Sequence, residues 1–310
     1  HHIFETTSNL ILLRSSLGNY YTTTGNFFRA LEFYEELIHL VKEPYDVYPT
    51  HDVFLINALA TSYSRLGEIH TELCILDHAL EYFKESNRLF EKLHEAYSDN
   101  ETIKNNLAIS YQYLGNMLQN VPIHYDQALR FYEAYYRLEK ELFETYPDNE
   151  EFKDNFATSY CKLGEMHTLQ GNLDQALDFF KTYNRLNKEL YEASPDNVSF
   201  KNGLAVSYCK LAEMHILQGN LDRTFVFFEE GIHLNKELHE AHPENVFLKK
   251  GLALCYSKLA SIYEKTENQP KAKENYLLSK ELLTQLVKSF PQYFEYKNNL
   301  NWVVNKLSEL

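Results

Sequence analysis

The sequence predicts an all-α protein, a right-handed superhelical solenoid of antiparallel helical hairpins. Three observations support this fold class. The stretch 156–197 returns almost whole at 204–245. Apolar residues within it step by three or four, which is the period of one helix face. Glycine and proline number only 10 and 8, and both residues are unfavourable inside helices.

A leucine recurs along the chain at steps of 48 or 49 residues. It stands at Leu17, Leu66, Leu114, Leu163, Leu211, Leu259 and Leu307. This period divides the chain into units 10–54, 55–100, 101–148, 149–196, 197–245 and 246–292, with a partial capping helix at 296–310. Units in such an array contact only their neighbours, so we expect one solenoid over residues 1–310 without a domain break.

Each unit is expected to form two helices. In unit 149–196 the first apolar stripe consists of Phe152, Phe156, Tyr160, Leu163 and His167. Gly171 and Asn172 interrupt the pattern, and Asn172 is a plausible N-cap for the second helix. A second stripe follows, and the turn Ser194-Pro195-Asp196-Asn197 ends it. The unit is therefore predicted to be a hairpin of a first helix and a second helix.

The conserved spacing within the copies has a recognisable form. Unit 149–196 shows it as Tyr160, Leu163, Gly164, His167, Ala176, Phe180 and Pro195. Unit 55–100 shows it as Tyr63, Leu66, Gly67, His70, Ala79 and Phe83. These residues resemble the tetratricopeptide repeat, and the resemblance covers nearly the whole chain. It implies a stack of hairpins that binds proteins or peptides on its concave face.

The period of 48 residues exceeds the family's usual ~34. The extra residues lengthen both helices by about two turns each, at ~3.6 residues per turn. The chain is thus similar to long-helix arrays of large bacterial proteins, which stand beside caspase-like peptidase or nucleotide-driven signalling domains.

Small and aromatic residues at fixed positions predict how the helices pack. Glycines of the first helices are expected to let each first helix approach the small alanine of its second helix; they are Gly18, Gly67, Gly115 and Gly164. The pairs Phe179-Phe180 and Phe227-Phe228 are expected to direct one ring into their own hairpin and one toward the next.

Composition limits the function classes. The net charge of −14 disfavours binding to nucleic acid, which needs a basic stripe. No apolar run approaches the ~20 residues of a membrane helix. The cysteines are Cys74, Cys161, Cys209 and Cys255, and none forms a CxxC pair. The opening residues do not have the pattern of a signal peptide. We therefore expect a cytoplasmic protein without structural disulfides.

Catalytic motifs are absent from the sequence: it holds no glycine-rich phosphate loop, no HExxH and no nucleophile elbow. The interpretation is a protein that is not an enzyme and carries no cofactor and no metal. His70, His167 and His215 share one repeat position. A metal array is one reading, but tyrosines fill this position in other units, which favours packing.

Two columns of residues are candidates for recognition. The first is a column of lysines, namely Lys104, Lys153, Lys201, Lys249 and Lys297. It would suit an acidic helix or phosphates, but its presence in every copy favours a role within the repeat, such as pairing with Asp or Glu of the turn. Recognition residues should vary between copies, because a ligand does not repeat.

The second column follows from the family resemblance, which implies that first helices line the concave face. Its varying positions give the candidate binding residues Val206, Cys209, Glu213, Ile216, Leu254, Trp302, Glu165 and Thr158. They predict an apolar groove with an acidic edge, suited to an amphipathic or basic helix. The alternative is that the longer helices, or chain outside this sequence, cover the stripe.

The predicted function is a non-catalytic protein- or peptide-binding scaffold. The alternative is a regulatory or sensor domain of a larger bacterial enzyme, a peptidase or a signalling NTPase. Self-association through the solenoid ends is a third possibility. The loop 120–125 is either a docking point or a local repacking, and Gly231 predicts a flexible hairpin or a close neighbour.

Overall fold

The computed structural model describes the backbone of residues 2–47 and 53–310. In these residues it holds thirteen α-helices, one 3-10 helix and no strand. They are α1 (His2–Thr23), α2 (Phe27–Val47), α3 (Val53–Glu72), α4 (Leu76–Ala96), α5 (Glu101–Leu118), η1 (Pro122–His124), α6 (Tyr125–Thr145), α7 (Glu150–Leu169), α8 (Leu173–Ala193), α9 (Val198–Leu217), α10 (Leu221–Ala241), α11 (Val246–Lys265), α12 (Gln269–Ser289) and α13 (Phe294–Glu309). The predicted all-α solenoid of packed consecutive helices is confirmed. The end of predicted unit 10–54, at residues 48–52, lies outside the described residues.

The chain divides by its internal contacts into two compact units, His1–Ser159 and Tyr160–Leu310. They are called unit 1 and unit 2 below. The boundary falls inside α7, which is one uninterrupted helix. A single solenoid over residues 1–310 stays a prediction.

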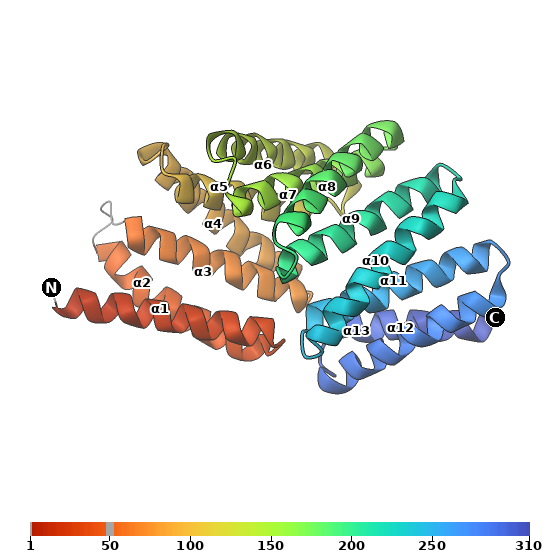
Figure 1. Ribbon diagram of the computed structural model, residues 1–310. Helices are drawn as coiled ribbons and strands as arrows, with labels where there is room; N and C mark the ends of the chain where they lie inside the picture. The colour runs from red at the N-terminus through yellow and green to blue at the C-terminus, as the bar shows by residue number, and fades with distance from the viewer. Residues whose placement is uncertain (1, 48–52) are drawn as a thin grey trace. The chain divides into compact units, whose positions relative to one another are not determined.

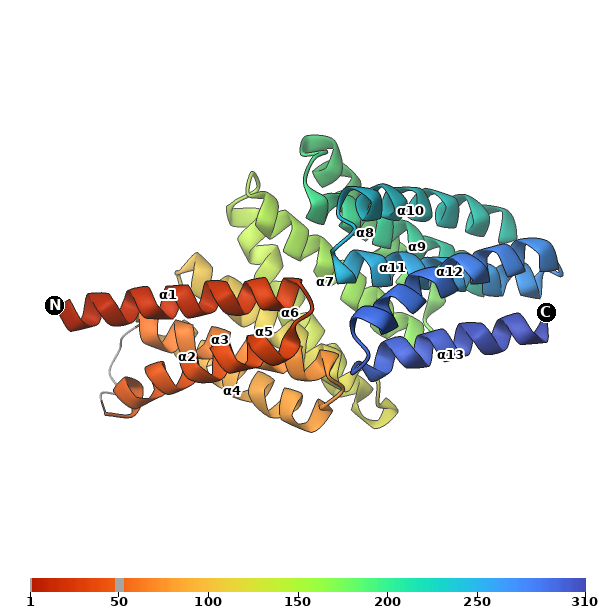
Figure 2. The same ribbon diagram turned by 90° about the horizontal axis from the view of Figure 1, so that it is seen from below.

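Helical hairpins make up each unit (Figure 1). In unit 1, α1 packs on α2, α3 on α4 and α5 on α6. In unit 2, α9 packs on α10 and α11 on α12, while α13 packs on α12. The second view shows α11, α12 and α13 side by side (Figure 2). Odd-numbered helices from α1 to α13 are the predicted first helices, and the even-numbered ones are the second helices.

Short turns join the two helices of a hairpin. Gly171 and Gly219 take φ values of +80° and +74° in these turns, a region that glycine enters without steric cost. The equivalent residues Cys74 and Glu267 take φ values of 60° and 59°. The turn geometry is thus maintained even where the sequence supplies no glycine.

Asparagines start the first helices. The side chain of Asn197 accepts hydrogen bonds from the backbone N–H groups of Ser199, at 2.9 Å, and of Phe200. Asn245 does the same at the start of α11. Asn172 also stands at the N-cap of α8, but its side chain makes no cap hydrogen bond. Its backbone, with ψ at 64°, lacks the extended geometry of Asn197, with ψ at 113°. The predicted capping role of Asn172 is therefore wrong.

The glycines of the first helices face aromatic rings. A Cβ atom on Gly164 would lie 2.8 Å from the ring of Phe180, and one on Gly67 would lie 2.6 Å from the ring of Phe83. The nearest side chains to these glycines are thus aromatic rings, and the close approach to the alanine of the second helix stays a prediction. Ala176 is itself fully buried, but the ring four residues later occupies the space beside the glycine.

The paired phenylalanines agree with the prediction for one ring of each pair. Phe179 contacts the rings of Tyr160 and His167, which lie in α7 of its own hairpin. Phe227 contacts Tyr208 and His215 of α9 in the same way. The direction of Phe179 and Phe227 into their own hairpins is therefore confirmed, and the direction of Phe180 and Phe228 toward the next hairpin stays a prediction.

Gly231 marks a close approach of α10 to α9. A Cβ atom at this position would lie 2.9 Å from the sulfur of Cys209 and 3.0 Å from the carbonyl oxygen of Ala205. Of the two predicted roles for Gly231, the close neighbour is the one observed.

Candidate functional site

The candidate binding residues of unit 2 lie on four of its first helices, and Glu165 is the one in α7. Helix α9 carries Val206, Cys209, Glu213 and Ile216 at spacings that share one helix face. Leu254 lies in α11, and Trp302 lies in α13. Thr158 is half-buried in α7, within unit 1.

Exposure differs along this stripe. Trp302 is 44% exposed. Val206, Ile216 and Leu254 are half-buried, whereas Cys209 is buried. The prediction that long helices bury the stripe completely therefore does not hold for Trp302. We call the half-buried and exposed apolar members, Val206, Ile216, Leu254 and Trp302, the apolar stripe.

Side-chain contacts bring the first helices of unit 2 side by side. Glu213 of α9 forms an ion pair with Lys258 of α11. The sulfur atoms of Cys209 and Cys255 are 3.4 Å apart across the same two helices. Lys306 of α13 lies 3.1 Å from Glu264 of α11. The residues of the candidate site thus belong to one row of neighbouring helices.

A row of alternating charges runs across these helices. The Lys162 ammonium lies 3.0 Å from one Glu165 oxygen, and the Lys210 ammonium lies 2.6 Å from the other. Lys210 is also 3.8 Å from Glu213, which pairs with Lys258. We call these five residues the charged row. The predicted acidic edge is thus charge-balanced, because each of its carboxylates faces lysines.

Ionisation of the charged row follows from this geometry. Burial opposes the charge on Glu165, but the ammonium groups of Lys162 and Lys210 lower the pKa of its carboxyl to about 2. Burial likewise opposes the charge on Lys210, yet Glu165 raises its pKa. Burial raises the pKa of the nearby Cys161 thiol to about 12. Glu165 and Lys210 therefore stay ionised near neutral pH, and Cys161 stays a thiol.

Trp302 belongs to a polar-aromatic group formed by residues of α11, α12 and α13. Its indole meets the ring of Tyr276 edge to face, with centroids 5.9 Å apart. The Tyr276 hydroxyl donates to Glu264 at 2.8 Å, and Lys306 pairs with the same carboxylate. The Trp302 indole thus packs on the Tyr276 ring, and the Tyr276 hydroxyl is in turn hydrogen-bonded to Glu264.

The histidines of the shared repeat position pack against aromatic rings. His167 stacks on Phe179 with an interplanar angle of 9°, and His215 stacks on Phe227 with an angle of 3°. His70 lies 5.2 Å from the Tyr82 ring. Burial lowers the pKa of His215 and of His70. Across the described residues, no group of three or more potential ligands is placed to hold a metal ion.

Two members of the lysine column pair with the second helix of their own hairpin. Lys104 lies 3.2 Å from Glu141, and Lys201 lies 2.6 Å from Glu237. These two lysines form ion pairs as predicted, but the predicted location of the partner is wrong for them, because Glu141 and Glu237 lie near the end of the second helix and not in the turn.

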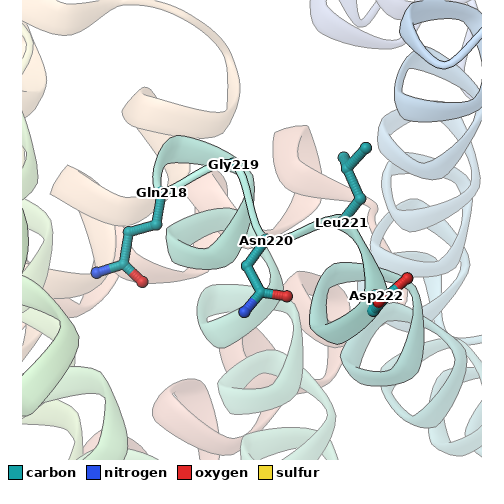
Figure 3. Close-up of a pocket in the computed structure, with 5 residues that line it drawn as sticks. All are labelled: Gln218, Gly219, Asn220, Leu221 and Asp222. Atoms are coloured by element: carbon teal, nitrogen blue, oxygen red, sulfur yellow. The ribbon is translucent and has the colours of Figure 1, made fainter.

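Loop 120–125 was a further candidate, and a second loop shows a hollow. In loop 120–125, Pro122–His124 form the 3-10 helix η1, and Ile123 is 85% exposed. A surface hollow lies at the α9–α10 turn, lined by Gln218, Gly219, Asn220, Leu221 and Asp222 (Figure 3). The side chains of Gln218 and Asn220 point to one side of this turn, and Leu221 points to the other (Figure 3). Asn220 caps α10 by accepting from the N–H of Arg223, so its polar side chain already has a structural role.

Sequence reasoning missed the lysines of the charged row and Cys255. The lysines had a readable signal, because they recur two residues after the aromatic anchor in consecutive copies, at Lys162, Lys210 and Lys258. Cys255 stands at a different repeat position from Cys209, so the repeat alignment separates the two.

Comparisons with known proteins address the fold. No family model matches the sequence, and no curated protein matches it. Among solved structures, BtubC (BKLC) from P. vanneervenii is similar, with a TM-score of 0.57, 15% identity, and coverage of 84% of this chain and 92% of BtubC. A Rap protein complexed with Competence and Sporulation Factor gives a TM-score of 0.56, 15% identity, and coverage of 94% and 74%.

A third similar structure is the Rap conjugation gene regulator of the plasmid pLS20 in complex with the Phr* peptide. Its TM-score is 0.51 at 14% identity, with coverage of 94% of this chain and 73% of that protein. These neighbours are tetratricopeptide-like helical-repeat proteins. Because the sequence identities are only 14–15%, the similarity to these proteins concerns the fold alone.

The candidate site combines two kinds of side chain. It offers half-buried apolar side chains beside a row of paired charges. Among the described residues, no helix combines the length and the apolar character needed to cross a bilayer.

Proposed function

We propose that this chain is a non-catalytic scaffold of the tetratricopeptide type, a long-helix variant with a 48-residue period, which binds a protein or peptide. Its array runs through residues 1–310 as one solenoid in a bacterial cytoplasm. The partner lies along the first helices of unit 2. The observation that carries the proposal is the apolar stripe, whose Trp302 is 44% exposed on a surface where the neighbouring charges are paired.

The apolar stripe supports a partner with its own apolar face. Exposed apolar patches on folded proteins commonly mark interaction sites. Covering Trp302, Leu254 and Val206 would remove apolar area from water, which stabilises a complex by about 25 cal/mol per Å². An amphipathic helix supplies such a face at i, i+3, i+4 and i+7.

Charge favours a partner with basic residues beyond its apolar face. The carboxylates of Glu165 and Glu213 are already paired with lysines, so direct contact with them offers little new stabilisation. The net charge of −14 acts over longer distances, and it steers basic partners toward the chain.

The structural neighbours add support of a general kind. Two of them were solved with a bound signal, Competence and Sporulation Factor in one and the Phr* peptide in the other. A fold of this type therefore suits peptide binding, and we propose the same class of partner for this chain.

The experiment is a selection of binders from a random peptide display library with the purified 310-residue chain. Selected peptides are then titrated against the wild type and a Val206→Glu/Leu254→Glu variant. The charge-matched control is Val226→Glu/Leu277→Glu, which changes residues of second helices that are 56% and 48% exposed. We expect at least a tenfold loss of affinity in the first variant and no loss in the control.

The proposal fails if no peptide is selected. It also fails if both variants, folded by circular dichroism, bind as tightly as the wild type.

A further inference from the structure

Cys209 and Cys255 form a pair of neighbouring thiols between α9 and α11. Their sulfur atoms are 3.4 Å apart although 46 residues separate them in the sequence. Both are free cysteines. Cys209 is 8% exposed, and Cys255 is half-buried. Cys255 is thus the less covered residue of the two.

The second helix α10 shapes the space around this pair. Gly231 leaves room for the Cys209 sulfur, since a Cβ atom there would lie 2.9 Å from it. The amide nitrogen of Asn235 donates to the Cys255 sulfur at 3.6 Å. Gly231 therefore lies beside the Cys209 sulfur and Asn235 beside the Cys255 sulfur, and the two sulfur atoms contact one another.

Charged residues one turn further along flank the thiols. Lys258 stands three residues after Cys255 in α11, and Glu213 stands four residues after Cys209 in α9. The two side chains form an ion pair. The hydrogen bond from Cys209 lowers the pKa of the Cys255 thiol, burial opposes this, and the Lys258 ammonium lowers it further. Cys255 is thus the better nucleophile of the pair, because the thiolate is the reactive form.

We propose that Cys209 and Cys255 form a reversible dithiol–disulfide centre that crosslinks α9 to α11. The oxidant is a small-molecule disulfide. The Cys255 thiolate attacks one of its sulfur atoms, and the small disulfide's S–S bond breaks with release of one thiol, which takes the Cys255 proton. The Cys209 sulfur then attacks the Cys255 sulfur of the mixed disulfide. A second small thiol leaves with the Cys209 proton, so that one disulfide is reduced and one is formed.

The geometry needs only a local movement. A disulfide has a sulfur–sulfur length of about 2.05 Å, so the two sulfur atoms approach by little more than 1 Å. Side-chain rotation supplies such a shift without separating the helices. The crosslink would fix the spacing of two neighbouring first helices, and its formation does not depend on the proposed peptide partner.

The test treats the reduced, full-length chain with oxidised glutathione under native conditions, blocks remaining thiols with iodoacetamide, and identifies crosslinked peptides by mass spectrometry without reduction. We expect a peptide pair joined through Cys209 and Cys255, lighter than the two thiol peptides by two hydrogens and separated again by dithiothreitol. Cys255→Ser should abolish the crosslink.

Cys161→Ser is the matched control. Cys161 is also a buried thiol of a first helix, but its recorded neighbour is Glu165 at 4.0 Å, so this variant should keep the crosslink. Alkylation of both Cys209 and Cys255 in the treated wild type, or glutathione adducts on both without a crosslink, would overturn the proposal.

Discussion

The carboxylate of Glu165 in α7 lies 2.6 Å from the ammonium of Lys210 in α9, the first helix of the next hairpin. The side chains of both are about four-fifths covered, at 19% and 22% exposure. A charge pair with this little solvent contact links consecutive hairpins and is sensitive to the loss of either partner.

Replacing Glu165 should destabilise the chain and change its response to acid. We expect Glu165→Gln to lower the free energy of unfolding at pH 7 by about 1.5–3 kcal/mol, because Lys210 loses its charged hydrogen-bond partner. The pKa of Glu165 is lowered in the folded state to about 2, so its contribution is present above the ordinary pKa and is lost as the pH falls toward 2. Urea unfolding between pH 7 and pH 2 measures this.

The control for this prediction is Glu189→Gln, which removes an exposed i, i+4 pair with Arg185 on α8. Exposed pairs contribute ~0.2–1 kcal/mol. Equal losses in the two variants, or an unchanged pH profile in Glu165→Gln, would contradict the account.

Glu139 should have the opposite pH dependence. Both of its carboxyl oxygens are buried without a hydrogen-bond partner, and burial together with Glu151 raises its pKa well above the ordinary value. The folded state therefore loses stability as the pH rises above the ordinary glutamate pKa, since the unfolded chain ionises more readily.

We expect Glu139→Gln to raise the melting temperature at pH 8 and to change it little at pH 4. Thermal unfolding at both pH values checks this. Asn187 of α8 stands at the same position of the next hairpin and is also buried. An amide side chain therefore fits at this position. A melting temperature that falls equally at both pH values would disprove the role of the charge.

Two helical glycines should respond in opposite directions to alanine. The Cβ atom in Gly164→Ala would lie 2.8 Å from the Phe180 ring, and overpacking of this kind costs about 1–3 kcal/mol. Gly251 has no atom within 4 Å of a built Cβ, so Gly251→Ala should stabilise α11 by about 1 kcal/mol. Chemical unfolding measures the change in the free energy of unfolding of each variant. A change of the same sign in both variants would contradict the packing described for these glycines.

The helix caps give a second matched pair. Asn197→Ala removes two hydrogen bonds at the start of α9 and should cost about 1 kcal/mol. Asn172→Ala removes no side-chain cap hydrogen bond, so its effect should be much smaller. Denaturant midpoints of the two variants compare them directly, and an equal cost would mean that Asn172 caps α8 in solution.

Repetition explains how much of the fold could be predicted from the sequence. Leu163, Tyr160 and Phe180 recur in register with their counterparts, so the helices and their pairing were predictable. Side-chain neighbours were not. The contact of Gly164 with Phe180 depends on how far a ring reaches from α8, which spacing along the chain does not reveal.

The candidate site could be predicted only in part. Val206, Leu254 and Trp302 were identifiable because their positions vary between copies. The pairing of Glu165 with Lys210, and the meeting of Cys209 with Cys255, depend on the offset between neighbouring helices. That offset comes from packing, and a single sequence does not specify it.

The central claim is that a peptide partner covers the apolar stripe, and Trp302 offers the most direct measurement. It is the one tryptophan of the chain, and its indole is 44% exposed. Tryptophan emission of the wild type is recorded during titration with a tryptophan-free peptide from the library selection. The account predicts a blue shift that saturates at the affinity found independently by anisotropy of the labelled peptide. Saturable binding by anisotropy with no change in Trp302 emission would contradict it.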